Sequence, residues 1–297
     1  MKRLLTITLL FVALPVLADE KKADAPKKQV EIPKGALVMV VMDPLAAPLS
    51  CPCVEGYAQR DYDKLAEHLS QKLGRPVSVA YSDSLIAALK DKTEGKADII
   101  IGKHSVVLFD AKKAGRQLKH VAMLTSKEGN VTQHGLIVVP TKDPAKTVAD
   151  LKGYQIIFGT EESDEKHAAA LALLKKHGVP APEKIETRSA CDEGATLILE
   201  AGPDHRGAAV ISSYAKPLLE GCGTVQKGDL RVIGETAPVP FVAAFVSDAL
   251  EQSLQESIQK ELLGIFSEPL LCVALETKFG FVEPAKKKVA AAAKKSS

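Results

Sequence analysis

The sequence lacks the short motifs by which several large enzyme classes are recognised. Its 297 residues contain no GxSxG nucleophile elbow, no GxxxxGK[ST] phosphate loop, no HExxH zinc motif and no GxGxxG dinucleotide motif. Aromatic residues make up only 4% of the chain, and tryptophan is absent. These absences favour a binding protein over an enzyme. The 46% of hydrophobic residues still supplies enough material for one or two α/β domains.

Long apolar runs are missing except at the N-terminus. Residues 4–17 are apolar, follow Met1-Lys2-Arg3 and end in a small-residue stretch before Asp19. This order is typical of a secretory signal peptide covering residues 1–18, with cleavage after Ala18. No later run approaches the ~20 apolar residues that a membrane span requires. We therefore expect an exported, periplasmic protein without membrane insertion.

An excess of charge of one sign is also missing. Without residues 1–18, 37 Lys and Arg residues face 37 Asp and Glu residues. Broad contact with nucleic acid requires clustered excess basic residues, so the sequence predicts no nucleic-acid partner. Residues 19–34 and 285–297 have no apolar periodicity and are expected to form a flexible linker and a basic low-complexity tail.

Cysteines are few and odd in number. The chain has five, and two of them, Cys51 and Cys53, flank one proline in the segment SCPCVEGYAQRDY. In an oxidising compartment cysteines pair or bind metal rather than stay reduced. Cys51 or Cys53 therefore pairs with a distant cysteine such as Cys191, or both hold a metal; Cys222 and Cys272 are candidates for a separate bridge.

Short apolar runs alternate with amphipathic stretches along the chain, which is typical of βαβ units. The expected strands cover residues 37–42, 77–81, 98–102, 121–124, 136–139, 155–158, 208–211, 230–233 and 241–246. A helix is expected from Tyr62, with Asp61 as its N-cap and Gly74 as its stop. Further helices are expected over residues 85–92, 105–114, 163–177, 193–200, 214–220 and 249–266.

Several segments, taken in order, resemble one family of exported binding proteins. They are YDKLAEHL (62–69), LGRPV (73–77), GKADII (95–100), TVADLKG (147–153), LRVI (230–233) and PVP (238–240). From about Leu37 to Pro284 the chain is similar to the periplasmic phosphate/phosphite/phosphonate-type substrate-binding proteins of ABC transporters. The resemblance implies an α/β, two-lobed type II periplasmic binding protein fold, each lobe a largely parallel sheet flanked by helices.

The resemblance also implies a domain division and a function. Residues 35–135 plus 243–284 would form lobe 1, and residues 136–242 would form lobe 2. A small phosphate- or phosphonate-like anion would be captured between the lobes, without catalysis, by a monomer that delivers it to an ABC permease.

The ligand site that the resemblance implies lies in strand-to-helix loops and crossing segments. Its expected residues are Tyr57, Lys103, His104, Ser105, Gln133, His134, Thr160, Ser163, Cys191, Asp192, Ser213 and Tyr214. One matching segment, residues 158–167, carries four acids where the family has a segment rich in Ser, Thr and Gly. These acids either favour a helix start by complementing its dipole, or oppose a phosphonate dianion and suit a cation.

Two further hypotheses use the cysteines. Cys51 and Cys53 on an extended loop, with His104 and His134, have the donor types that suit Cu(I) or Zn(II), in a metal-handling or redox accessory protein with an exported redox partner. An exported thiol enzyme with one of these histidines as base is the third alternative, and no enzyme motif supports it.

Overall fold

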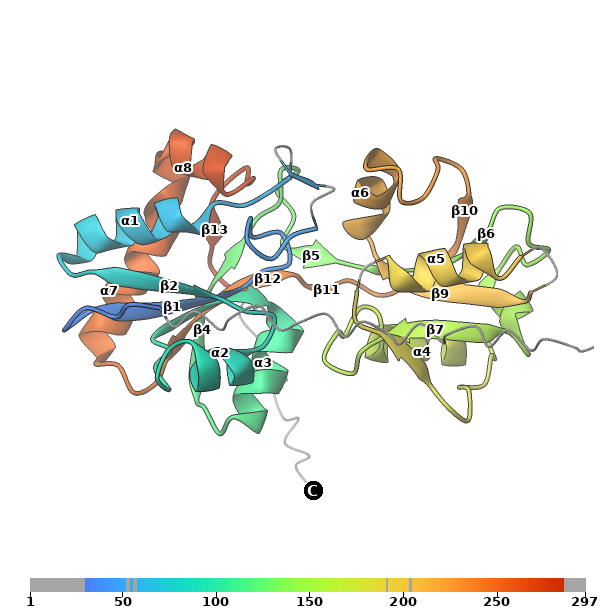
Figure 1. Cartoon of the computed structure of the whole chain (residues 1–297), viewed down its shortest axis with the longest axis horizontal. Helices are drawn as coiled ribbons and strands as arrows, with labels where there is room; N and C mark the ends of the chain where they lie inside the picture. The colour runs from blue at the N-terminus through green and yellow to red at the C-terminus, as the bar shows by residue number, and fades with distance from the viewer. Residues whose placement is uncertain (1–29, 52–53, 56–57, 191, 203–204, 286–297) are drawn as a thin grey trace, which may run out of the picture.

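The computed structural model describes residues 30–51, 54–55, 58–190, 192–202 and 205–285. Two β-sheets, each flanked by helices, lie side by side and are joined by two crossing segments (Figure 1). We call the sheet of β1 and its helices the first lobe, and the sheet of β7 and its helices the second lobe. The predicted α/β, two-lobed fold is confirmed.

The first sheet has the strand order β13-β4-β12-β3-β1-β2. Its strands are β1 (Leu37–Met42), β2 (Val77–Tyr81), β3 (Ile99–Lys103), β4 (Leu118–Leu124), β12 (Val242–Ser247) and β13 (Phe281–Val282). Helices cover both faces of this sheet, and the side chains of each strand alternate between these faces. In β1, Met39 and Val41 pack toward α1 (Tyr62–Leu73), α7 (Gln252–Leu263) and α8 (Pro269–Ala274), whereas Val38 and Val40 pack toward α2 (Leu85–Asp91) and α3 (His104–Lys113).

The second sheet has the order β10-β6-β9-β7-β8. Its strands are β6 (Gly135–Pro140), β7 (Gln155–Gly159), β8 (Glu186–Arg188), β9 (Gly207–Ser212) and β10 (Leu230–Glu235). One face packs on α4 (Ala168–Lys176) and the 3-10 turn η2 (Val148–Leu151), and the other on α5 (Glu193–Glu200) and α6 (Ala215–Gly221). Both lobes therefore have a helix–sheet–helix layering.

The crossing segments explain a departure from the expected strand directions. β5 (Thr132–Gln133) and β11 (Val239–Pro240) pair with each other as an antiparallel ribbon between the lobes. The strands that follow them, β6 and β12, run antiparallel to their sheet neighbours. Only the βαβ pairs, such as β1 with β2 and β3 or β7 with β8 and β9, are parallel. Both sheets are thus mixed rather than largely parallel.

Helix ends follow the sequence signals where these are local. The Asp61 side chain accepts a hydrogen bond from the Lys64 N–H at the start of α1, and Gly74 ends the helix with φ 64°, a conformation that favours glycine. The predicted helix over 163–177 is wrong at its start, because residues 161–167 form turns and α4 begins at Ala168. The acids of this segment therefore do not cap a helix.

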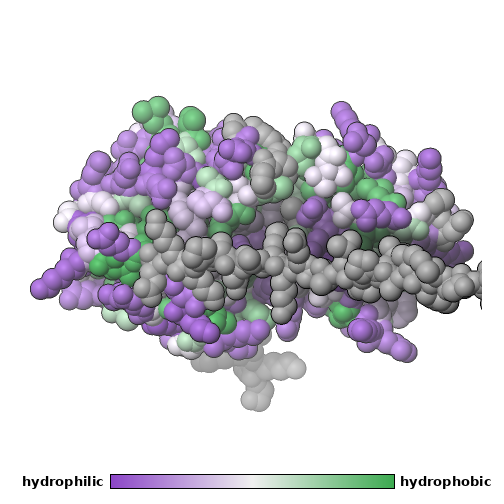
Figure 2. All heavy atoms as spheres, in the orientation of Figure 1, coloured by the Kyte–Doolittle hydropathy of each residue, from purple (hydrophilic) through white to green (hydrophobic). Residues whose placement is uncertain are grey.

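The outer surface is mainly hydrophilic on the face drawn in Figure 2. Apolar side chains gather at α8 of the first lobe, where Leu270 is 86% and Val273 is 72% exposed. Within the part of the chain that the structure describes, no helix has the length and apolar character needed to cross a membrane.

Candidate functional site

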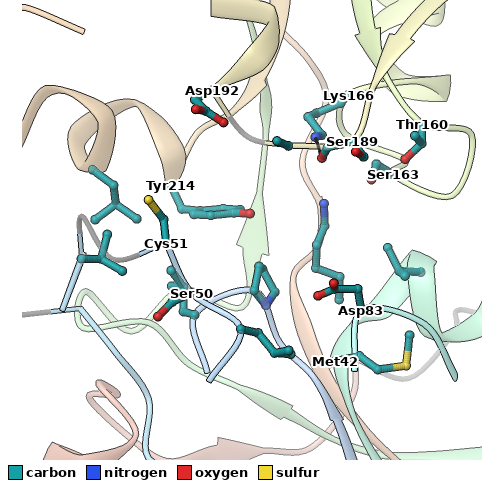
Figure 3. Close-up of a pocket in the computed structure, with 18 of the residues that line it drawn as sticks. Met42, Ser50, Cys51, Asp83, Thr160, Ser163, Lys166, Ser189, Asp192 and Tyr214 are labelled. Atoms are coloured by element: carbon teal, nitrogen blue, oxygen red, sulfur yellow. Dashed lines mark hydrogen bonds between the residues drawn. The ribbon is translucent and has the colours of Figure 1, made fainter. Parts of the chain in front are cut away.

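A cavity of about 690 Å³ lies between the two lobes and is lined by residues of both. Figure 3 shows Cys51 and Tyr214 on one side of it, with Thr160, Ser163 and Lys166 across from them. Cavities of this size accommodate small organic molecules, and a junction between lobes is a usual place for them.

The first-lobe wall is built by the segment that follows β1. Met42 ends the strand and is 4% exposed, and the chain then turns so that Leu45, Leu49 and Val54 face the cavity. Leu218 of α6 adds to this apolar surface from the second lobe. An apolar wall of this kind stabilises the organic part of a ligand by removing its surface from water.

A buried polar cluster fixes the segment that follows β1. Asp43 is fully buried and its Oδ2 accepts hydrogen bonds from Arg60 Nη1 at 2.8 Å and from the Tyr62 hydroxyl at 2.5 Å. Burial and the charge of Asp43 raise the pKa of Tyr62 well above its usual value, so the hydroxyl remains a donor. The cluster links the end of β1 to the start of α1 and holds the cavity wall in place.

An aromatic stack connects this cluster to the cavity. The Arg60 guanidinium lies 5.6 Å from the ring centroid of Phe241, and Phe241 stacks on Tyr214 with centroids 4.9 Å apart. Phe241 directly precedes β12, and Tyr214 follows β9 and lines the cavity. Tyr214 thus presents one face of its ring and its hydroxyl at the junction of the two lobes.

The second-lobe wall supplies donors for an anion. Thr160, Ser163, Lys166 and Ser189 line it, and Lys166 Nζ donates to the carbonyl of Ser189 at 3.4 Å. The Lys166 side chain runs over Gly159, where an added Cβ would lie 2.5 Å from Cβ of Lys166. Hydroxyls and an ammonium group are suited to phosphoryl or sulfonyl oxygens. Asp83, Glu162 and Asp192 also line the cavity and give it acidic groups.

An ion pair joins the two lobes beside the cavity. Lys103, the last residue of β3, lies 2.6 Å from Glu165 Oε1, and Ser212 Oγ donates to the same oxygen at 2.6 Å. Burial alone would raise the pKa of Glu165, but the charge of Lys103 and these hydrogen bonds outweigh it and lower the pKa. Glu165 therefore stays ionised near neutral pH.

The structure brings part of the predicted site together. Lys103, Thr160, Ser163, Asp192, Tyr214 and the metal candidate Cys51 line the cavity. Five predicted residues do not line it: His104 packs inside the first lobe, and Ser105, Gln133, His134 and Ser213 make contacts elsewhere. Tyr57, Cys53 and Cys191 lie outside the described residues.

Ser105, Gln133, His134 and Ser213 hold the lobes and crossing segments together. Ser213 and His134 exchange hydrogen bonds, with Ser213 Oγ accepting from the His134 N–H at 3.1 Å. Gln133 is 2% exposed in the crossing ribbon. The Ser105 hydroxyl accepts from the Asp164 N–H of the second lobe at 3.3 Å. These contacts stabilise the arrangement of the lobes and crossing segments.

The expected metal constellation does not assemble among the described residues. The His104 ring packs against His120 and Phe245 with centroids 5.1 and 5.7 Å away, inside the first lobe. His134 Nδ1 instead lies 3.1 Å from the Thr236 carbonyl oxygen. No group of three His, Cys, Asp or Glu side chains in the described ranges is placed to hold a metal ion.

The suggested bridge between Cys222 and Cys272 is also wrong. Cys272 is a buried thiol in α8 of the first lobe and donates to the Ile265 carbonyl at 3.3 Å, whereas Cys222 follows α6 in the second lobe. The sequence alone does not show which cysteines are neighbours in the fold.

Glu165 and Lys166 are the main site residues that sequence reasoning missed. They lie in the acidic segment 158–167, whose acids suggest either a helix start or repulsion of a dianion. Glu165 has a partner 62 residues away, which no local pattern shows. The available signal is a lysine at the end of a buried strand of one lobe, together with an acid in a loop of the other lobe that the fold would turn toward it.

The comparisons with known proteins agree with this architecture. Residues 56–290 match the family model described as "ABC transporter, phosphonate, periplasmic substrate-binding protein". Among curated proteins, none matches the sequence significantly. Several solved structures share the fold at low sequence identity.

A phosphonate-binding protein of Prochlorococcus marinus in complex with methylphosphonate is 14% identical, with a TM-score of 0.62 over 85% of this chain and 93% of that one. A binding component of a Pseudomonas aeruginosa ABC phosphonate transporter is 12% identical, with a TM-score of 0.61 over 84% and 81%. A Xanthomonas citri protein bound to ATP is 17% identical, with a TM-score of 0.62 over 85% and 92%.

The family match covers most of the chain and both lobes, and it supports solute binding rather than the metal-handling alternative. This is a family of transport proteins and not an enzyme class. The chain belongs to the periplasmic substrate-binding proteins of phosphonate ABC transporters.

Proposed function

We propose that this protein captures a small organic anion of the phosphonate type in the cavity between its lobes and delivers it to an ABC permease. The observation that carries the proposal is the cavity itself, which combines hydroxyl and ammonium donors of the second lobe with an apolar wall to which both lobes contribute. Thr160, Ser163 and Lys166 would contact the anionic head. Leu45, Leu49 and the Tyr214 ring would contact the organic substituent.

Capture requires the lobes to move. We propose that residues 35–135 plus 243–284 and residues 136–242 act as two rigid units that rotate about the β5–β11 ribbon, and that the closed form is the one the permease recognises. The mature protein would begin after Ala18 in the periplasm and act as a monomer. No chemical step on the solute is part of this function.

A thermal-shift panel on the mature protein tests the proposal. Alkyl- and arylphosphonates and the matching sulfonates are expected to raise the melting temperature, because a ligand that binds only the folded state stabilises it. Ala190 lines the cavity, and Ala190→Trp is expected to abolish the shift by filling it. Ala181→Trp, at an exposed position that does not line the cavity, is the matched control and should keep the shift.

The outcome against the proposal is equally specific. If no phosphonate or sulfonate shifts the melting temperature, or if Ala190→Trp retains the full shift, binding in this cavity is refuted.

A further inference from the structure

The ion pair of Lys103 and Glu165 is the feature of the cavity that solute capture alone does not explain. Lys103 ends a strand of the first lobe, and Glu165 lies in the turns between β7 and α4 of the second. Their side chains are 9% and 0% exposed, and the distance from Nζ to Oε1 is 2.6 Å. Among the residues that the structure describes, Lys103 is the one first-lobe ammonium that lines the cavity, and its partner is a carboxylate of the protein itself.

Close packing holds Glu165 in this position. The segment lies so near to the start of β6 that a Cβ on Gly135 would be 1.9 Å from the Glu165 carbonyl oxygen. On one side the Asp164 N–H donates to Ser105 Oγ, and on the other Ser212 Oγ donates to the Glu165 carboxylate. The carboxylate is therefore preorganised on Lys103 and does not swing away without breaking several contacts.

The charge of Glu165 changes the electrostatic character of the cavity. With Lys103 neutralised by Glu165, the other charged groups among the described lining residues are Lys166 and the three acids Asp83, Glu162 and Asp192. A compact dianion must exchange its hydration for opposite charges and donors, and carboxylates nearby oppose it. A singly charged anion with an organic substituent meets a smaller penalty and also gains from the apolar wall.

We infer that the Lys103–Glu165 pair is a specificity determinant that withholds the Lys103 charge from the ligand and selects singly charged organic anions over compact dianions such as inorganic phosphate. This inference rests on the proposed capture of a solute in the cavity and names its charge class. It assigns Glu165 a role in selectivity although its side chain does not line the cavity.

The first test uses the wild-type protein and two probes of the same shape. Phenylphosphonate and benzenesulfonate differ in charge above neutral pH, where the phosphonate is mostly a dianion. Isothermal titration calorimetry is expected to give tighter binding of benzenesulfonate. Tighter binding of phenylphosphonate would overturn the inference and would still support solute capture, so the two failures are distinguishable.

The second test uses inorganic phosphate and Glu165→Gln. This substitution removes the charge and keeps an acceptor for Lys103 and Ser212, so phosphate affinity is expected to rise about tenfold to a hundredfold, the value of one charge-assisted hydrogen bond. Combining it with Lys103→Gln should cancel the gain. Glu161→Gln, which removes a charge from an exposed position of the same segment, should change the affinity by less than about threefold.

Two results contradict the inference. One is a Glu165→Gln protein, folded by circular dichroism, whose phosphate affinity equals that of the wild type. The other is a double variant that keeps the gain, because the gain would then not come from Lys103.

Discussion

Lys103→Met is expected to destabilise the protein far more than Glu165→Gln, although each breaks the same ion pair. Without Lys103, a fully buried carboxylate keeps Ser212 as its hydrogen-bond donor and has no ion-pair partner at 2.6 Å. Removing one partner of a buried pair costs about 3–5 kcal/mol. At about 2–4 °C per kcal/mol, the melting temperature should fall by roughly 6–20 °C.

Glu165→Gln leaves Lys103, rather than a carboxylate, without its ion-pair partner. Lys103 lines the cavity, and the amide oxygen of the new glutamine still accepts a hydrogen bond from its ammonium. The expected cost is the charge-assisted part of one hydrogen bond, about 1–2 kcal/mol. Urea unfolding at neutral pH, followed by circular dichroism, measures both variants.

The pH dependence adds an internal check. In the wild type the pKa of Glu165 is lowered in the folded state, so its stabilising contribution is present above the unfolded pKa and is lost as the pH falls through the folded pKa. In Lys103→Met, burial raises the pKa of Glu165. The loss of stability relative to the wild type should therefore shrink toward acid pH as the Glu165 carboxyl group becomes neutral. Equal destabilisation by the two substitutions, or a deficit that grows in acid, would refute this reasoning.

Three further predictions concern stability and are measured by chemical or thermal unfolding. Asp43→Ala removes the acceptor that Arg60 uses in a buried cluster and should cost about 3–5 kcal/mol, whereas Asp43→Asn should cost less. Gly135→Ala should cost at least about 1–3 kcal/mol because its Cβ meets the Glu165 carbonyl at 1.9 Å; an unchanged stability would show that this segment yields. Burial, and secondly a neighbouring histidine, lower the pKa of His120 to about 4, so folded protein should lose stability progressively as the pH falls from about 6.5 to 4, and His120→Gln should flatten that slope.

The sequence predicts elements best where the signal is local and long. Strand β1 was predicted with its observed bounds, because six apolar residues are bounded by a turn on either side. The start of α1 followed from Asp61 and the helical spacing of its apolar residues. The strands β5, β8, β11 and β13 were missed, because two or three residues are too short to show a period.

The candidate site was predictable only in part for a related reason. Lys103 ends a strand and Asp192 and Tyr214 precede helices, so the fold places them at the cavity. The role of Glu165 depends on a contact between lobes, and acids before an apolar run look like a helix start. His104 was expected at the ligand and instead packs on Phe245, because position in a loop does not fix the direction of a side chain.

Isothermal titration calorimetry with methyl-, propyl- and phenylphosphonate is the most direct test of capture by the cavity. Binding at one molecule per chain is expected, with an affinity that rises by about fourfold for each CH2 group removed from water by the apolar wall. Ala190→Trp should eliminate this binding. Affinities that do not depend on the substituent, or no binding of any of the three, would contradict the account.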